Sequence, residues 1–349
     1  MQTALSLRLP GGRHARWIAL VLVLACLAAW GTGARAAATP PITEYPLPTS
    51  AAGPQDITSG PDGSLWVTEN LANKIAKVTT TGVATEYTVP TTNANVVEVT
   101  AGSDGALWFT ELSIKKIGRA TTAGEITELP LTGTTGGPSS IINGPGGLWF
   151  TLPDDNAVGR ITTAGVTSTF VLTTTNVDVR DLVLGPDGMI WATETSFATD
   201  AIARLNPANK QVTEYPLPDF GGTSQLAVAN GMIYFTVTQS NLIARLNPAT
   251  GAVTSFPIPT ADVQPTGITA GQDGNIYFTE AADGAPGLGR LEPNGTITEW
   301  TAPTANSSIQ AITLGPDGNL WYAGFASNKI GKVSLATGVK VFLPSRGFT

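Results

Sequence analysis

The chain has 349 residues, of which 42% are hydrophobic and 13% charged, with 39 glycines and 25 prolines. This composition, with its many Thr and Val residues, is rich in strand and turn formers and too apolar for a disordered chain, so it predicts an all-β globular protein. The 19 basic and 26 acidic residues give a net charge of −7 without a dense basic cluster beyond the N-terminus, which argues against nucleic acid as a partner.

Residues 1–36 have the pattern of an export signal. Three arginines are followed by an apolar run at 17–30 and by Ala-Arg-Ala at 34–36, so a Sec-type signal peptide with a cut before Ala37 is predicted. The apolar run is too short to span a bilayer comfortably, and no transmembrane span is expected. The predicted location is secreted or periplasmic. A lipid anchor at Cys26 stays open as the alternative, because the Val-Leu-Ala-Cys ending there approaches a lipobox.

Removal of this leader restricts the chemistry of the mature chain, 37–349. Cys26 and His14 are the only cysteine and histidine, and both precede the predicted cut. The mature chain therefore has no disulfide, thiolate nucleophile, Cys/His zinc site or histidine base. The leader also takes away four arginines, which lowers the net charge from −7 to −11.

A repeat organises the rest of the sequence. Gly-Pro-Asp-Gly-Ser-Leu-Trp-Val-Thr-Glu at 60–69 returns six more times in related form, and its aromatic landmark recurs every 41 to 44 residues, at Trp66, Trp108, Trp149, Trp191, Tyr234, Tyr277 and Trp321. A period of this length is typical of propellers.

Each unit predicts four short strands. Strand A ends at the Gly-x-Asp-Gly hairpin turn, B is Leu-Trp-Phe-Thr-Glu-like, C is Lys-Ile-Gly-Arg-like, and D is Ile-Thr-Glu-Tyr-Pro-Leu-Pro-like. Proline in strand D marks an edge strand. Residues 37–349 are therefore predicted to form one seven-bladed β-propeller of four-stranded antiparallel blades, expected as a monomer. Of the two terminal D copies, 42–48 and 339–344, the N-terminal one is the better consensus and is predicted to close the ring.

One ring of candidate site residues lies two positions before the strand-A Ile or Leu: Gln55, Val97, Ser139, Arg180, Ser224, Thr266 and Gln310. Asp56, Glu98 and Asp181 stand next to it. Gln55, Asp56, Glu98, Arg180 and Asp181 are the candidates for ligand binding. Arg180 could bind a carboxylate bidentately, or pair locally with Asp178, Asp181 or Glu194.

A second ring ends strand B and contains Glu69, Glu111, Glu194 and Glu280. Both rings are expected on one face, opposite the Gly-x-Asp-Gly turns. Four glutamates there could bind Mg²⁺ or Ca²⁺, or supply a general base. The alternative is that each belongs to the blade consensus and accepts local backbone hydrogen bonds at the B–C turn.

The unit G-x-D-G-x-[LI]-W-[FV]-T-E, with N-x-I-[GA]-[KR] and T-E-Y-P-[LV]-P, resembles the blade of the virginiamycin B lyase family over 42–344. The resemblance implies a seven-bladed propeller. It also implies an elimination that linearises cyclic depsipeptide antibiotics, in which a base removes an α-proton while bound magnesium polarises the substrate.

The family's histidines lie in Pro-His-[AG]-Ile-Thr segments, and the resemblance places Thr266 and Gln310 at those positions. It places Ser308 at the metal-binding glutamate and Gln55 at an aromatic residue of the first blade. No catalytic residue is assigned, because neither Thr266 nor Gln310 can act as a base near neutral pH and Ser308 is a poor metal ligand.

Three functions stay open, and whether the chain is an enzyme is undecided. The first is a non-catalytic propeller that binds a small molecule or an extracytoplasmic protein or glycan. The second is a diverged enzyme, a carbon–oxygen lyase or one acting on lactones, that uses Asp56 and the strand-B glutamates with or without a divalent metal. The third is lyase chemistry that persists with substituted residues.

Overall fold

The computed structural model describes residues 39–175, 177–196 and 199–335. The predicted leader, with His14 and Cys26, and the C-terminal D copy at 339–344 lie outside these residues. Within them, no helix is long and apolar enough to cross a membrane.

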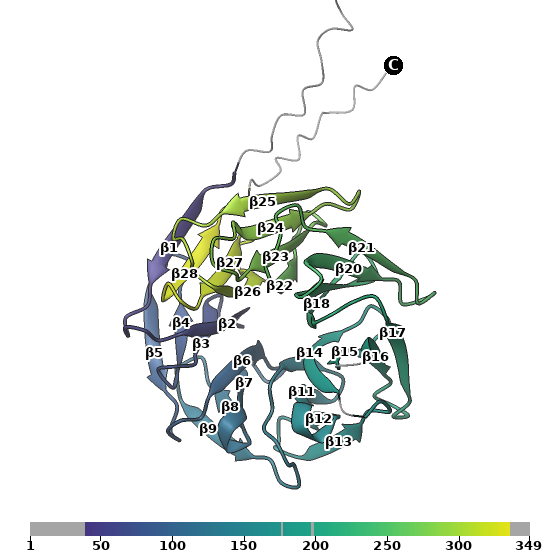
Figure 1. Cartoon of the computed structure of the whole chain (residues 1–349). Coiled ribbons are helices and arrows are strands. Elements are labelled where there is room, and N and C mark those ends of the chain that lie inside the picture. The colour runs from purple at the N-terminus through teal and green to yellow at the C-terminus, as the bar shows by residue number, and fades with distance from the viewer. Residues whose placement is uncertain (1–38, 176, 197–198, 336–349) are drawn as a thin grey trace, which may run out of the picture. The chain divides into compact units, whose positions relative to one another are not determined.

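The described chain forms seven four-stranded antiparallel sheets arranged in a ring, as the sequence predicted (Figure 1). Blades 1 to 3 comprise β2 (Pro54–Ser59), β3 (Leu65–Glu69), β4 (Lys74–Val78) and β5 (Ala84–Thr88); β6 (Val96–Ala101), β7 (Leu107–Glu111), β8 (Lys116–Ala120) and β9 (Ile126–Pro130); and β10 (Ile141–Gly144), β11 (Gly147–Leu152), β12 (Ala157–Ile161) and β13 (Thr167–Val171). Short 3-10 helices, Leu112–Ile114 and Pro153–Asp155, follow β7 and β11.

Blades 4 to 6 comprise β14 (Asp178–Leu184), β15 (Ile190–Thr195), β16 (Asp200–Leu205) and β17 (Val212–Leu217); β18 (Thr223–Ala229), β19 (Met232–Val237), β20 (Leu242–Leu246) and β21 (Val253–Pro257); and β22 (Pro265–Ala270), β23 (Ile276–Glu280), β24 (Gly287–Leu291) and β25 (Ile297–Thr301). Blade 7 comprises β26 (Ile309–Leu314), β27 (Leu320–Gly324), β28 (Lys329–Val333) and β1 (Ile42–Pro46).

The N-terminal strand closes the ring, which confirms the prediction. β1 pairs with β28 in the antiparallel register Ile42↔Val333 to Pro46↔Lys329. The last blade is thus completed by a strand from the other end of the propeller, so separation of blades 7 and 1 requires breaking a strand pair as well as an apolar interface.

The hairpin turns hold the aromatic residue of strand B. The Asp62 Oδ1 atom accepts a hydrogen bond from Trp66 Nε1 at 3.2 Å, and Asp104, Asp187 and Asp317 do the same for the tryptophans of their blades. A Cβ on Gly60 would lie 2.4 Å from the Trp66 ring. Glycine is therefore required at the start of this turn, where the backbone packs directly on the indole.

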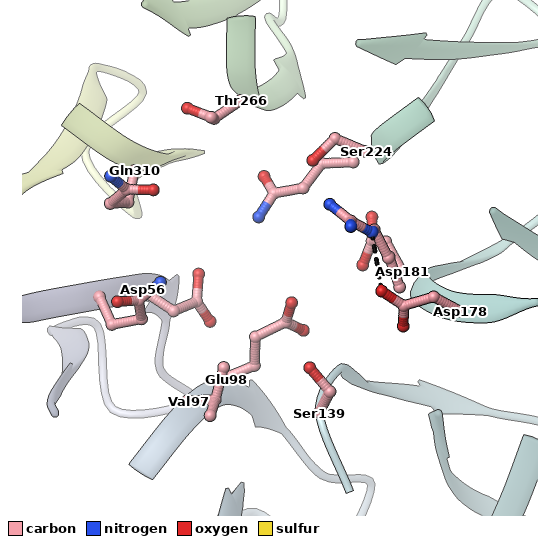
Figure 2. A pocket seen from close by; sticks show the side chains of 12 residues that line it. Asp56, Val97, Glu98, Ser139, Asp178, Asp181, Ser224, Thr266 and Gln310 are labelled. Atoms are coloured by element: carbon pink, nitrogen blue, oxygen red, sulfur yellow. Dashed lines mark hydrogen bonds and ion pairs between the residues drawn. The ribbon is translucent and has the colours of Figure 1, made fainter. Parts of the chain in front are cut away.

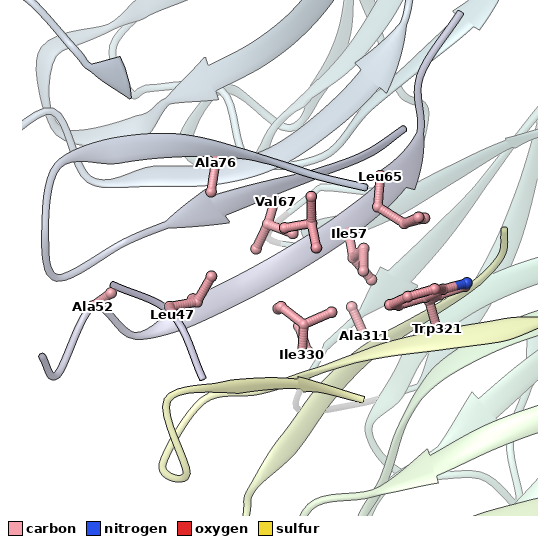
Figure 3. Close-up of a cluster of buried hydrophobic side chains, with 11 residues drawn as sticks. Leu47, Ala52, Ile57, Leu65, Val67, Ala76, Ala311, Trp321 and Ile330 are labelled. Atoms are coloured by element: carbon pink, nitrogen blue, oxygen red, sulfur yellow. The ribbon is translucent and has the colours of Figure 1, made fainter. Parts of the chain in front are cut away.

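The core lies between neighbouring blades. Figure 3 shows the cluster between blades 7 and 1, where Trp321 and Ile330 pack against Leu47, Ile57 and Val67. Clusters of the same kind join the other blades. Burial of a large aromatic side chain at every interface is the main apolar contribution to the stability of the ring.

Candidate functional site

A polar cavity of about 300 Å³ lies where the first strands of the seven blades converge. It is lined by Gln55, Asp56, Val97, Glu98, Ser139, Asp178, Arg180, Asp181, Ser224, Gln225, Thr266 and Gln310. All seven residues of the first predicted ring are among them, together with the three acidic neighbours. Figure 2 shows the labelled side chains entering the central space from different blades.

Bulges in the first strands aim these residues inward. The pairing of the first strand with the second shifts between Pro54 and Ile57 in blade 1 and between Val96 and Val99 in blade 2, and corresponding shifts occur in blades 4 to 7. A bulge interrupts strict alternation, so two consecutive residues can approach the same space. Gln55 and Asp56 therefore both line the cavity.

A strand-B threonine accepts a backbone hydrogen bond at the bulge in blades 1, 2, 4, 5 and 6, whereas blade 7 has Ala323 at this position. Thr68 Oγ1 accepts a hydrogen bond from Asp56 N at 3.0 Å and donates to Val97 O, in the next blade, at 2.7 Å. Thr110 makes the same two contacts with Glu98 N and Ser139 O. Sequence reasoning missed this positioning role, as it missed Gln225 in the lining. The available signal was the threonine that precedes the second-ring position in six of the seven repeats.

Three of the four pocket carboxylates also link blades. Asp56 Oδ2 accepts from Val99 N at 2.9 Å, and Glu98 Oε2 accepts from Ile141 N at 3.1 Å. Asp181 accepts from Leu226 N at 2.7 Å and, through its other oxygen, from Ser140 Oγ at 2.8 Å. Each carboxylate thus bridges its own first strand and the adjacent one.

These carboxyl groups hold protons more tightly than usual. Burial raises the pKa of Asp56 and of Asp181 to about 6, although the backbone hydrogen bonds that they accept oppose the shift. Burial, and then the neighbouring charges of Asp181 and Asp56, raise the pKa of Glu98 well above its ordinary value. The cluster can therefore exchange a proton near neutral pH.

Arg180 is half exposed at the cavity and pairs with Asp178. Its Nε atom lies 3.1 Å from Asp178 Oδ2. Of the three local partners considered from the sequence, Asp178 is the one that it contacts in this ion pair. Its exposure leaves the guanidinium accessible from the cavity.

The strand-B glutamates do not join the first ring. Glu69, Glu111 and Glu194 have no exposed surface and Glu280 is 2% exposed, and they lie in four different sheets. The end of strand B pairs with the start of strand A, as in Pro54↔Glu69, so both rings lie at the same end of the strands, as expected. Strand alternation nevertheless keeps the glutamate side chains out of the pocket lining. Glu69 lies two residues after Val67, which packs between blades 7 and 1, so its side chain faces that interface.

Each buried glutamate lies near a strand-D glutamate. Burial, followed by repulsion from Glu86, raises the pKa of Glu69 to about 8. The same causes act on Glu111 beside Glu128 (about 8) and on Glu194 beside Glu214 (about 7). Burial also raises the pKa of Glu280 to about 8, where the N–H of Gly287 donates to Glu280 Oε2 at 3.0 Å and Glu299 adds repulsion.

Of the four strand-B glutamates, only Glu280 accepts a local backbone hydrogen bond among the described residues. No donor among the described residues reaches the carboxyl oxygens of Glu69, Glu111 or Glu194. Their raised pKa values favour the protonated, neutral form, which is the form that a buried carboxyl adopts most readily. Over the described ranges, no group of three or more His, Cys, Asp or Glu residues is arranged to hold a metal ion.

The positions equated with the family's catalytic residues lie close together and are uncharged. Thr266 Oγ1 donates to Ile309 O at 3.1 Å and lies 2.9 Å from Thr279 Oγ1. Gln310 Nε2 donates to Ser308 Oγ at 2.8 Å. Magnesium is bound through carboxylates and phosphates, so this neutral set does not fit the metal that the family resemblance implies.

Seven four-stranded blades around a polar axial cavity define a seven-bladed β-propeller with a candidate ligand pocket at its centre. Within that class, the chain belongs to the virginiamycin B lyase family, whose model matches residues 31–147 and 132–346.

Solved structures agree with this membership. A streptogramin B lyase is 34% identical with a TM-score of 0.79, over 85% of this chain and 98% of its own. Virginiamycin B lyase from Staphylococcus aureus is 34% identical with a TM-score of 0.78, over 85% and 99%. A catalytically inactive variant of the S. aureus lyase, with a histidine replaced by alanine and with quinupristin, is 33% identical with a TM-score of 0.79 over the same shares.

Proposed function

We propose that this protein is an exported propeller that binds a small polar ligand in its central pocket and does not perform histidine-dependent elimination. The supporting observation is the pocket lining. It offers amides, hydroxyls, four carboxyl groups and a guanidinium, whereas the sequence has no histidine after His14. A cavity of about 300 Å³ is at the lower end of the range for small-molecule sites.

The contrast with the solved relatives supports the same proposal. Replacement of one histidine accompanies loss of catalysis in the S. aureus variant. Here the family resemblance puts Thr266 and Gln310 at the histidine positions, and neither side chain ionises near neutral pH. Their hydroxyl and amide groups can orient a ligand through hydrogen bonds but cannot remove an α-proton as a base.

The first experiment measures turnover and binding in the same samples. The purified protein is incubated with a type B streptogramin and magnesium, with the S. aureus lyase as the positive control, and ring opening is followed by mass. We expect the lactone to remain intact. A panel of polar small molecules is then screened for an increase in melting temperature, and the pocket variant Gln310→Ala should lose any such increase. Linear product at the rate of the control would overturn the proposal.

The pocket carboxylates favour a second candidate, an enzyme that acts on cyclic esters through acid–base chemistry. Asp56, Glu98 and Asp181 have raised pKa values, as a general base or acid working near neutral pH requires. A lactone panel assayed from pH 5 to 8 tests it. Activity that is lost in Glu98→Gln, in a protein that still melts cooperatively, would support the enzyme. Activity equal in both proteins would exclude Glu98 from the reaction.

The proposal that the protein is exported depends on the predicted signal peptide at residues 1–36, and it is tested separately. Expression of the full chain in a bacterial host, followed by mass analysis of the N-terminus in each cell fraction, should give a chain that begins at Ala37. A lipid-modified Cys26 in the membrane fraction would favour the anchored alternative. An intact leader in the cytoplasm would contradict export.

A further inference from the structure

An asparagine holds the loop that leads to the next blade in four of the seven blades. Asn73, Asn156, Asn241 and Asn328 each stand immediately before the third strand, with φ between 52° and 57°. In blade 1, Asn73 Nδ2 donates to Val89 O at 3.1 Å and to Thr91 O at 3.0 Å, and its Oδ1 accepts from Ala94 N at 2.8 Å. A carboxamide thus supplies both donors and the acceptor that this loop needs.

Asn156 and Asn241 make the same three contacts, and Asn328 makes two of them. Asn241 donates to Thr260 O at 2.9 Å and accepts from Val263 N at 2.9 Å. Asn328 donates to Thr49 O at 2.9 Å and accepts from Ala52 N at 2.6 Å. Asn156 donates to Thr174 O and accepts from Val177 N.

In blades 2 and 4, the residue at this position is not asparagine, and its side chain makes a single hydrogen bond to the loop. Lys115 Nζ donates to Thr135 O in blade 2. Asp200 Oδ2 accepts from Thr223 N at 2.8 Å in blade 4. Six blades therefore place a polar side chain against this loop.

Blade 6 has Pro286 at this position. The equivalence rests on the backbone hydrogen bond, because Ala302 N donates to Pro286 O at 2.8 Å, as Val89 N donates to Asn73 O at 3.0 Å. Pro286 does not share the positive φ of the four asparagines. Proline brings no polar side-chain atom. Ser307 Oγ replaces one contact, since it donates to Thr304 O at 2.5 Å.

Two backbone groups remain without a partner among the described residues, the C=O of Ala302 and the N–H of Ser307. They correspond to the C=O of Val89 and the N–H of Ala94, which Asn73 satisfies in blade 1. Ala302 is 6% exposed and Ser307 is 4% exposed. Buried backbone groups without partners are rare in folded proteins, because water no longer compensates for the lost hydrogen bond.

A cavity of about 150 Å³ lies beside these groups. Pro286, Ala302, Thr304 and Ser307 line it, together with small residues such as Ala282 and exposed Ala305. The volume is below that of a pocket for a drug-sized molecule, so the cavity suits one functional group of a ligand. It lies between blades 6 and 7, and its lining includes Glu280 of the second ring but no residue of the first ring.

We propose that this cavity binds the primary carboxamide of a small molecule. The ligand NH₂ group donates to Ala302 O and to the remaining lone pair of Thr304 O, and its carbonyl accepts from Ser307 N–H. The same set of groups is bound by a carboxamide from the protein's own chain in blades 1, 3 and 5. A carboxylate of the same shape is disfavoured, because it would place negative charge against two carbonyl oxygens.

The test is an NMR titration of the ¹⁵N-labelled protein, expressed as the full chain, with propanamide. We expect a saturable shift of the Ser307 amide resonance in the millimolar range usual for so small a ligand, and at least tenfold weaker binding of propanoate. No shift at Ser307, or equal shifts with both compounds, would overturn the proposal.

Two variants make the result specific to the cavity. Ala305→Trp places a large side chain on an exposed wall residue and should abolish the Ser307 shift, whereas Ala249→Trp, at an exposed turn of blade 5, should leave it unchanged. Pro286→Asn supplies an internal carboxamide and should also abolish binding while raising the melting temperature. If Pro286→Asn fails to fold, the comparison of Ala305→Trp with Ala249→Trp still tests whether the ligand binds in this cavity. Binding that survives Ala305→Trp would contradict the proposed location.

Discussion

The central pocket and the blade interiors both bury carboxyl groups, but they stabilise them in different ways. Asp56, Glu98 and Asp181 accept backbone hydrogen bonds from a neighbouring blade and border a cavity. Glu69 and Glu111 lie beside another glutamate, with no donor to their carboxyl oxygens among the described residues. The first arrangement ties blades together and presents oxygens to a ligand. The second favours a neutral acid inside a sheet interface.

Asp181→Ala should give the largest effect on stability. It removes the acceptor for Leu226 N and Ser140 Oγ, leaving buried donors unpaired at a cost of about 3 kcal/mol in the free energy of unfolding. Urea unfolding at pH 7 measures it. Glu194→Gln, in the adjacent strand, is the matched control and should cost much less. Equal losses would mean that the two kinds of carboxyl are not distinct.

Thr68→Val should have the next largest effect and lower the free energy of unfolding by about 2 kcal/mol. The substitution deletes the hydroxyl that accepts a hydrogen bond from Asp56 N and donates one to Val97 O. Thr68→Ser keeps the hydroxyl and should recover most of the loss. Denaturant unfolding of the two variants separates hydrogen bonding from packing. If serine and valine are equally destabilising, the hydroxyl does not fix the bulge.

Glu69→Gln should change how stability depends on pH. The pKa of Glu69 is about 8 in the folded protein against an ordinary value of 4.5, so the folded state binds the proton more tightly. Its contribution to stability is full below about pH 4.5 and is lost as the pH rises to about 8. Unfolding at pH 5 and pH 8 should show the variant losing about 2 kcal/mol less than the parent over this interval. Parallel pH profiles would mean that Glu69 is already ionised at pH 5.

Arg180→Ala should have the smallest effect, within about 0.5 kcal/mol, because its ion pair with Asp178 is exposed. Thermal melting at low and high salt measures it. A loss comparable to that of Asp181→Ala would show that this arginine also bridges blades, which its contacts do not indicate.

Much of the fold could be predicted because repetition makes each unit a copy of the same local pattern. The spacing from Trp66 to Trp321 determined seven blades, and the better strand-D consensus at 42–48 indicated closure by β1. The first ring was also predictable. Gln55 and its six counterparts occupy the same offset from the strand-A apolar residue, and the ring symmetry brings equal offsets to the same axis.

The sequence by itself therefore determined the class of fold, the number of blades, the closing strand and the residues around the axis, since each depends on period and offset alone. Tertiary structure decided which way a side chain points and what it meets there. The bulge that turns Asp56 inward, the interface that encloses Glu69 and the cavity beside Pro286 each depend on a neighbouring blade. Hydrogen bonding and burial are set by that neighbour, which lies a full repeat away in sequence or, at the closure, at the opposite end of the propeller.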